Sequence, residues 1–277
     1  MRILDPSSIR ITLPQLGLRP DDLAIIKEQL NAPNGMILNT GPTGSGKTTT
    51  LYAFLLSKLT PEIKIITIED PIEYHLGGVE QTQVDPEAGY DFASGLRSIM
   101  RQDPDVILVG EVRDKETSDI ALHAALTGHL VFSTVHANSA SGAIPRFLDL
   151  GVKPAGIGPA MNLIIAQRLV RKLCENCKVE GKLPPELESK IKKFISGLPK
   201  RVEKKDFEKI RVFAPKGCTK CVGLGYKGRV GVFELLEVGD EVEAMISPAI
   251  GEAAILKQAL KQGMVTMQQD GILKALA

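Results

Sequence analysis

The segment GPTGSGKT, residues 41–48, constrains the fold of this chain more than any other feature of the sequence. It fits the pattern G-x-x-x-x-G-K-[ST], in which small residues let backbone N–H groups converge on phosphate oxygens. The apolar run GMILN (Gly35–Asn39) before it is typical of a buried strand, and Lys47–Leu59 after it has helical spacing. A strand, a glycine-rich loop and a helix N-terminus in this order form a phosphate-binding site. We therefore expect the chain to bind a nucleoside triphosphate.

The positions of this loop have separate expected roles. Backbone N–H groups from Gly44 to Thr49 would surround the phosphates, where the helix dipole adds positive potential. Lys47 would reach the β and γ phosphates, and the Thr48 hydroxyl would bind Mg²⁺. The tetrapeptide N-K-x-D, usual in guanine-specific enzymes, does not occur, so ATP is the expected nucleotide. The predicted nucleotide-binding residues are Gly41, Thr43, Gly44, Ser45, Gly46, Lys47, Thr48 and Thr49.

Strand and helix patterns alternate between about residues 35 and 135. The further predicted strands are Ile63–Ile68, Val106–Val109 and Leu130–Val135, and the further predicted helices are Asp91–Arg101 and Thr117–Thr127, the latter opening on a hydroxyl cap. Such alternation with almost fully apolar strands predicts an α/β fold with a largely parallel sheet covered on both faces. Later in the chain, helices are expected at Ser141–Leu150, Gly158–Val170 and the last forty residues, and a strand or hairpin at RVGVFELLEV, residues 229–238.

Polar side chains follow the predicted strands. Glu69, Asp70 and Glu73 end the second strand, Glu111 follows the third, and His129 and His136 bracket the fourth. Polar groups beyond the carboxyl ends of parallel strands lie where open α/β sheets bind ligands. Glu111 would polarise an attacking water or hold Mg²⁺ through water. Taken singly, such carboxylates are more often helix caps or surface charges, and such histidines are more often structural.

The four cysteines form two C-x-x-C pairs, Cys174 with Cys177 and Cys218 with Cys221. Four thiolates are a usual ligand set of a closed, structural Zn²⁺ site, so we expect zinc. Redox-active pairs or four free thiols are the alternatives. Between the pairs, residues 178–211 contain eleven Lys/Arg against six Asp/Glu, with apolar residues at helical spacing. This pattern predicts an amphipathic insert that protrudes from the fold.

The overall composition excludes some classes of protein. The formal net charge is +1, which argues against a general polyanion binder. No run approaches 18 consecutive apolar residues, so a transmembrane helix is not expected. The start lacks the apolar core of a secretory signal, so no such signal is expected either. Hydrophobic residues make up 43%, which is enough for a sizeable core.

Four segments resemble, in order and spacing, the Walker A, Asp box, Walker B and His box of the secretion ATPase superfamily. They are GPTGSGKTTTLY, ITIEDPIEY, LRSIMRQDPDVILVGEVRD and TGHLVFSTVHAN, and the resemblance covers roughly residues 15–240. The superfamily comprises hexameric motors of type II secretion and type IV pili. The resemblance implies a RecA-like core that hydrolyses ATP. It also implies a homo-hexamer at the cytoplasmic face of the inner membrane, acting on an inner-membrane platform protein.

The resemblance also implies roles for single residues. Glu111 would be the Walker B glutamate that activates water, and Glu69 and Glu73 would be the Asp-box carboxylates. His136 would sense the γ-phosphate, and Arg113 is a further candidate for the active site. The His box reads HAN where many members have HTN, which leaves the histidine in place.

The cysteine pairs place the chain in the assembly and secretion branch of the superfamily, since the retraction ATPases lack them. Members of this branch carry further N-terminal domains, one of which lends arginines to the active site. Arg2–Asp5 look like the end of a preceding strand, so we expect a C-terminal fragment with weak activity on its own, with a minimal member of the branch as the alternative. The expected parts are a linker (1–34), the ATPase core (35–172), a cysteine subdomain (173–222), and a hairpin with helices (223–277).

Two other functions remain open from the sequence. A zinc knuckle beside a basic insert also fits a nucleotide-dependent nucleic-acid-binding or DNA-uptake factor. However, Trp is absent and aromatic residues are 4%, so stacking platforms are scarce and no specific nucleic acid is expected. The other alternative is a scaffold that binds ATP without hydrolysing it. The presence of both Lys47 and Glu111 argues against it.

Overall fold

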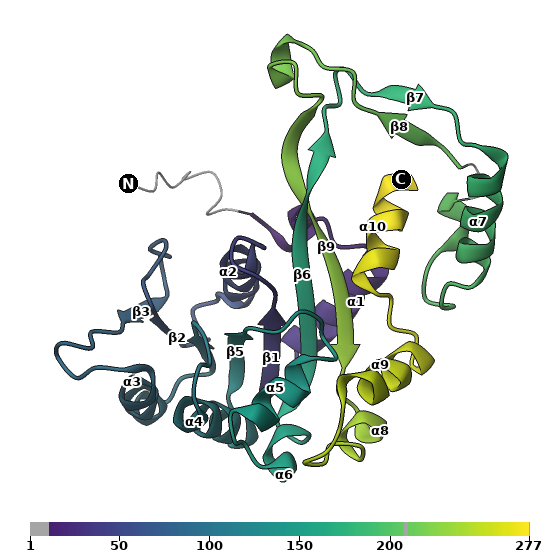
Figure 1. Ribbon diagram of the computed structural model, residues 1–277. Coiled ribbons are helices and arrows are strands. Elements are labelled where there is room, and N and C mark those ends of the chain that lie inside the picture. The colour runs from purple at the N-terminus through teal and green to yellow at the C-terminus, as the bar shows by residue number, and fades with distance from the viewer. Residues whose placement is uncertain (1–10, 208–209, 277) are drawn as a thin grey trace.

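The computed structural model describes residues 11–207 and 210–276, and a seven-stranded sheet lies at the centre of this part of the chain (Figure 1). The strand order is β3-β2-β4-β5-β1-β6-β9, and neighbouring strands are parallel except β6 and β9. The sheet confirms the predicted α/β class with a largely parallel sheet. Its strands are β1 (Gly35–Thr40), β2 (Ile65–Glu69), β3 (Glu80–Gln83), β4 (Val106–Val109), β5 (Leu130–Val135), β6 (Met161–Leu173) and β9 (Tyr226–Glu237).

Helices cover both faces of the sheet because successive strand residues point to opposite sides. In β1, Ile37 packs into one apolar cluster, whereas Met36 and Leu38 pack into the other. The first cluster includes α1 (Pro20–Leu30), α2 (Lys47–Lys58) and η2 (Leu13–Leu16). The second includes α3 (Phe92–Ile99), α4 (Lys115–Leu126), α5 (Ala143–Asp149), α6 (Pro154–Ile157), α8 (Asp240–Glu243) and α9 (Glu252–Lys261). The remaining helical elements are α7 (Pro185–Ser196), α10 (Met267–Leu276), η3 (Met100–Gln102), η4 (Lys204–Phe207) and η5 (Thr219–Cys221).

The four strands predicted before residue 136 are all present, and so are the helices between them. One detail differs at the start of α4. The cap is Asp114, whose carboxylate accepts a hydrogen bond from the Thr117 N–H at 2.8 Å, and not the hydroxyl of Thr117. An aspartate before the first turn satisfies a free N–H group of the helix as well as a hydroxyl does. Strand β3 was not predicted, because its residues EQTQ are polar.

The predicted helix at Gly158–Val170 is wrong, because residues 161–173 form the long strand β6. Its first half contains the continuous apolar run Leu163–Ala166. Such a run does not distinguish a buried strand from a buried helix. The two partners of β6 decide the conformation, and both are distant in sequence. β1 pairs with it in parallel from Met36↔Met161 to Thr40↔Ala166, and β9 pairs with it antiparallel.

Strands β6 and β9 extend beyond the sheet as a two-stranded arm (Figure 1). Burial changes along β6, where residues 161–167 are mostly buried and residues 168–173 are mostly exposed. The cysteine-containing turns lie at the end of the arm, and β7 (Val179–Gly181) and β8 (Val212–Ala214) form a small antiparallel sheet that leads from there to α7, beside α10 (Figure 1). The predicted amphipathic insert contains α7, whose apolar side packs toward α10. The predicted strand at 229–238 corresponds to β9, and the predicted C-terminal helices are α8 to α10.

The segment interpreted as a linker, residues 1–34, is described from residue 11 onward. The strand end expected at Arg2–Asp5 therefore lies outside the described residues. Within the described part, Ile26 and Leu30 of α1 are fully buried against the sheet. No helix in the described ranges is long and apolar enough to cross a membrane.

A buried network of charges joins three distant segments of the chain. The guanidinium of Arg19, before α1, contacts Asp22 at 2.8 Å and Asp270 of α10 at 2.5 Å. Arg201, from the insert, contacts Asp22 at 2.8 Å, and Lys274 contacts Asp270 at 2.6 Å. Burial raises the pKa of Asp22 to about 6, although the charge of Arg19 acts to lower it. The network ties α1, the insert and α10 together.

We expect Asp270→Asn to lower the free energy of unfolding by roughly 3 kcal/mol, because it leaves buried cations without their carboxylate. Urea denaturation measures the loss. Asp119→Asn is the matched control, since its ion pair with Lys115 spans 3.7 Å at the surface, and exposed pairs contribute below about 1 kcal/mol. Equal losses in both variants would contradict a stabilising role of the network.

Candidate functional site

The loop between β1 and α2 has the backbone conformation that its glycines allow. Gly41, Gly44 and Gly46 have φ angles of 147°, 77° and 91°, which side chains rarely tolerate. Gly46 caps the N-terminus of α2, so the first N–H groups of the helix face the loop. The predicted order of strand, loop and helix is confirmed. The loop is therefore suited to hold phosphate oxygens at a helix N-terminus.

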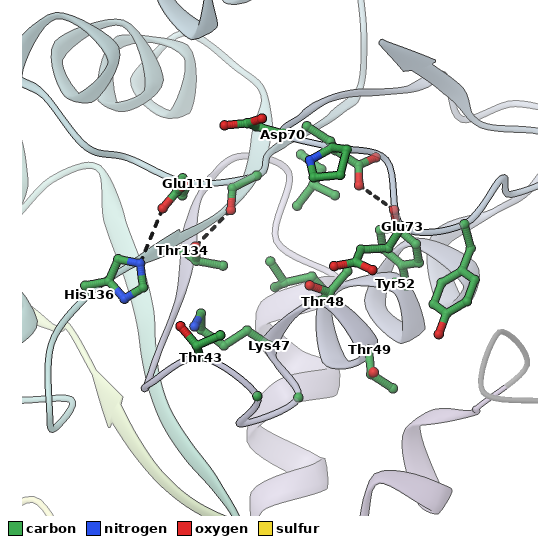
Figure 2. A pocket seen from close by; sticks show the side chains of 18 of the residues that line it. Thr43, Lys47, Thr48, Thr49, Tyr52, Asp70, Glu73, Glu111, Thr134 and His136 are labelled. Carbon is green, nitrogen blue, oxygen red and sulfur yellow. Dashed lines mark hydrogen bonds and ion pairs between the residues drawn. The ribbon is translucent and has the colours of Figure 1, made fainter. Parts of the chain in front are cut away.

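A pocket of about 420 Å³ opens beside this loop, at the carboxyl ends of the parallel strands (Figure 2). The end of β2 supplies Glu69, the loop after β4 supplies Glu111, and β5 supplies Thr134 with His136 following it. The predicted site residues that line the pocket are Thr43, Gly44, Gly46, Lys47, Thr48, Thr49, Glu69, Glu73, Glu111 and His136. Gly41, Ser45 and Arg113 are not among its lining residues.

Lys47 lies across the loop that carries it. Its Nζ donates to the carbonyl oxygens of Gly41 at 2.8 Å and Pro42 at 3.2 Å. Partial burial lowers the pKa of Lys47, and the charge of Glu111 acts in the opposite direction. Lys47 and Glu111 both line the pocket, as Figure 2 shows.

Glu111 is the centre of a small cluster of charges. One carboxylate oxygen lies 3.4 Å from Nε2 of His136, and the other contacts the guanidinium of Arg113. Arg113 also lies 3.3 Å from a carboxylate oxygen of Asp70. The hydrogen bond to Glu111 is the main reason that the pKa of Arg113 is raised. The side chain of Glu111 is 13% exposed, so the cluster holds a mostly buried carboxylate at the pocket wall.

The two carboxylates of the Asp-box segment have different surroundings. Glu69 is buried and accepts hydrogen bonds from Thr67 at 2.6 Å, from Gln81 at 3.1 Å and from the hydroxyl of Tyr52. Burial, and then the bond to Glu69, raises the pKa of Tyr52. Glu73 is half-buried on the following loop and lines the pocket. Glu69 is therefore fixed by its neighbours, whereas Glu73 lies closer to open space.

Sequence reasoning missed two pocket residues that come from the arm. Leu169 of β6 and the exposed Arg229 of β9 both line the pocket. The wrong helix prediction for Gly158–Val170 concealed Leu169, since it placed that segment outside the sheet. Arg229 belongs to no motif, and only the antiparallel pairing of Arg171 with Arg229 brings this part of β9 to the site.

The four cysteines converge at the end of the arm, as the sequence predicts. Their Sγ atoms all lie within 4.8 Å of one another. Neighbouring Sγ atoms are 3.9 Å apart for Cys174 and Cys218, 3.8 Å for Cys177 and Cys221, and 3.7 Å for Cys218 and Cys221. Tetrahedral zinc with Zn–S bonds of about 2.3 Å places sulfur atoms roughly 3.8 Å apart. The cluster is therefore compatible with zinc in its geometry.

The thiols of the cluster differ in their surroundings. Burial acts to raise the pKa of Cys221, but N–H groups of Cys218 and Gly225 point at its sulfur and lower the pKa to about 6. Burial raises the pKa of Cys177 to about 11. None of the four cysteines forms a disulfide. The cluster offers backbone N–H support to a thiolate, as metal-bound sulfur requires.

Comparisons with known proteins agree with the motifs. The family described as "Type II/IV secretion system protein" matches residues 1–277. The type IV pilus assembly ATPase PilB of Thermus thermophilus is 44% identical over 276 residues, which are 100% of this chain and 30% of that protein. The type II secretion system protein E of Pectobacterium carotovorum subsp. carotovorum is 44% identical over 277 residues, 100% of this chain and 53% of that protein.

A solved structure supports the fold in addition. The pilus retraction motor PilT with bound ADP is 30% identical, with a TM-score of 0.61, and the match covers 94% of this chain and 65% of PilT. The chain thus spans about half the length, or less, of the two curated relatives that it matches. The family match over the whole sequence and the 44% identity lead to one conclusion: the chain belongs to the type II/IV secretion system protein family.

Proposed function

We propose that this chain is the ATP-hydrolysing part of a motor for type II protein secretion or type IV pilus assembly. The observation that carries the proposal is the phosphate-binding loop facing Glu111 across a pocket of about 420 Å³. Two relatives named for secretion or pilus assembly support it, at 44% identity. A buried carboxylate opposite a phosphate site is what hydrolysis by a positioned water needs.

The residues of the loop are proposed to bind the nucleotide. Backbone N–H groups from Gly44 to Thr49 would donate to phosphate oxygens at the N-terminus of α2. Lys47 would exchange its bonds to the loop carbonyls of Gly41 and Pro42 for bonds to phosphate. Thr48 lines the pocket at the first turn of α2 and would hold Mg²⁺. When bound, Mg²⁺ neutralises charge that develops on the phosphate oxygens.

Glu111 is proposed to orient and deprotonate the attacking water. Its two contacts, with Arg113 and His136, hold the carboxylate at the pocket wall. His136 follows β5, lines the pocket, and would take the γ-phosphate as a hydrogen-bond partner in place of Glu111. Glu73, which lines the pocket, would act as the second Asp-box carboxylate near the bound Mg²⁺. Glu69 would act indirectly, because its hydrogen bonds with Tyr52, Thr67 and Gln81 fix it behind the pocket.

The active assembly is proposed to be a homo-hexamer that acts on an inner-membrane platform protein from the cytoplasmic side. The family resemblance and the absence of a membrane-spanning helix from the described residues are consistent with it. A nucleic-acid-dependent factor and an ATP-gated scaffold are the competing functions. Turnover that depends on DNA would favour the first competitor, and ATP binding without turnover would favour the second.

We expect Glu111→Gln to lower ATP turnover at least about 100-fold while the affinity for ATP stays within about twofold, because only the general base is lost. Phosphate release and calorimetric binding of Mg–ATP measure the two quantities. Glu116→Gln is the matched control, since this exposed carboxylate pairs with Arg97 outside the pocket. Normal turnover in Glu111→Gln would refute the assignment of the base.

We expect Lys47→Ala to weaken ATP binding by roughly 10- to 100-fold, because a hydrogen bond between charged groups contributes about 1.5–3 kcal/mol. Lys58→Ala, in the last turn of the same helix, is the control. An unchanged affinity in Lys47→Ala would contradict the binding site itself.

If the active form is an oligomer, wild-type turnover per chain should rise with protein concentration.

We also propose that the cysteine cluster binds one structural Zn²⁺. All four sulfurs would be ligands, so the site has no open position for chemistry. Its role would be to join the two chain segments that lead into and out of residues 178–217. The Sγ distances of 3.7–3.9 Å support this proposal.

Purified protein should contain about one zinc ion per chain, and Cys174→Ser should reduce the content to near zero. The variant should also increase amide hydrogen exchange in residues 178–217, since the ends of the insert are released. Elemental analysis and exchange measurements test both. Thr219→Ala, between Cys218 and Cys221 but without a sulfur, should keep its zinc. Unchanged zinc in Cys174→Ser would refute the site.

A further inference from the structure

One buried side chain outside every recognised motif lies directly against the phosphate-binding loop. Gln167, on β6, is 2% exposed. The last residue of β1, Thr40, pairs with Ala166, so Gln167 lies beside Gly41, where the chain leaves β1 and enters the loop. Its position follows from the parallel pairing of β6 with β1.

The amide group of Gln167 joins three parts of the site. Its Oε1 accepts a hydrogen bond from Nδ2 of Asn39 on β1 at 3.0 Å and from Oγ1 of Thr50 on α2 at 2.9 Å. Its Nε2 donates to the carbonyl oxygen of Ser45, within the loop, at 2.8 Å. All these groups are buried, where an unsatisfied partner is costly. The amide therefore fixes the strand before the loop, the loop itself and the helix after it.

Two loop glycines lie directly against residue 167, Gly41 against its backbone and Gly46 against its side chain. A Cβ atom on Gly41 would lie 2.4 Å from the backbone oxygen of Gln167, and one on Gly46 would lie 2.8 Å from its Nε2. Both distances are too short for real atoms. The loop thus packs directly on Gln167, with no side chain between them at these two positions.

We propose that Gln167 is a positioning residue for nucleotide binding: its amide holds the loop backbone at Ser45 in the shape that receives phosphates. The proposal rests on the proposed nucleotide site, and it adds a residue from β6 to that site. Gln167 does not line the pocket, so it acts through the loop and not on the nucleotide. Preorganised N–H groups bind phosphate without the entropic cost of ordering the loop first.

The test replaces Gln167 by Met, which keeps the length of the side chain but removes all three hydrogen bonds. Calorimetry with Mg–ADP should show about tenfold weaker binding, equivalent to ~1.4 kcal/mol. In steady-state hydrolysis the KM for ATP should rise while kcat at saturation changes little, because the bound nucleotide restores the loop. Amide hydrogen exchange at residues 41–46 should be faster in the free variant.

The matched control is Asn162→Leu, at the opposite end of β6. Asn162 also uses its amide to bond a backbone carbonyl, that of Asn34, at 2.9 Å, but away from the pocket. The Asn162→Leu variant should change neither the affinity for nucleotide nor the amide hydrogen exchange at residues 41–46. If Gln167→Met does not fold, Gln167→Glu serves instead, since it keeps the shape and the acceptor but cannot donate to Ser45.

Two outcomes would overturn the proposal. One is an affinity within twofold of wild type together with unchanged exchange at residues 41–46. The other is an equal loss in Asn162→Leu, which would show a general effect on β6. If wild-type protein binds no nucleotide, the proposed function fails, but the exchange measurement still decides whether Gln167 holds the loop.

Discussion

The parallel pairing of β1 with a strand on each side is the constraint on which the rest of the structure depends. β5 pairs with one edge of β1 and β6 with the other, so the carboxyl ends of β1 and β5 and the middle of β6 lie at the same edge of the sheet. The loop after β1, the histidine after β5 and the buried amide on β6 meet there for this reason. Carboxylates arrive from β2 and β4 by the same rule, since ligands of open α/β sheets bind beyond the carboxyl ends of the strands.

Strand β6 belongs to two environments along its length. Its first half has the apolar composition of a central strand, and it pairs with β1 and β9 inside the fold. Its second half pairs with β9 alone. There, charged residues are mixed with apolar ones and most side chains are exposed, as is common in an antiparallel pair that faces water. The cysteine cluster stands at the far end of the same strand that lies against the phosphate-binding loop. The pocket and the cluster are thus connected by one antiparallel ladder, whose register shifts between Arg171 and Leu173.

The sequence was most informative where function depends on local order along the chain. The loop 41–48, the strands leading to Glu69, Glu111 and His136, and the cysteine pairs are short patterns whose chemistry requires fixed spacing. Prediction failed where distant partners decide the conformation. Residues 161–173 form a strand because β1 and β9 flank them, and β3 forms because β2 offers an edge to a polar segment. Leu169, Arg229 and Gln167 reach the site only through those pairings, so no local pattern could identify them.

The arm has a consequence for how this chain can vary. The ladder of β6 and β9 ends with Leu173 opposite Tyr226, so the chain leaves and returns at one place. The segment between these residues, which contains β7, α7 and β8, therefore has its two ends held together by the ladder. The entropy of closing a loop grows only with the logarithm of its length, and each doubling costs about 0.6 kcal/mol. Insertions between the cysteine pairs that leave Arg201 and the packing of α7 toward α10 intact would therefore change the surface near the cysteine cluster with little effect on the stability of the sheet.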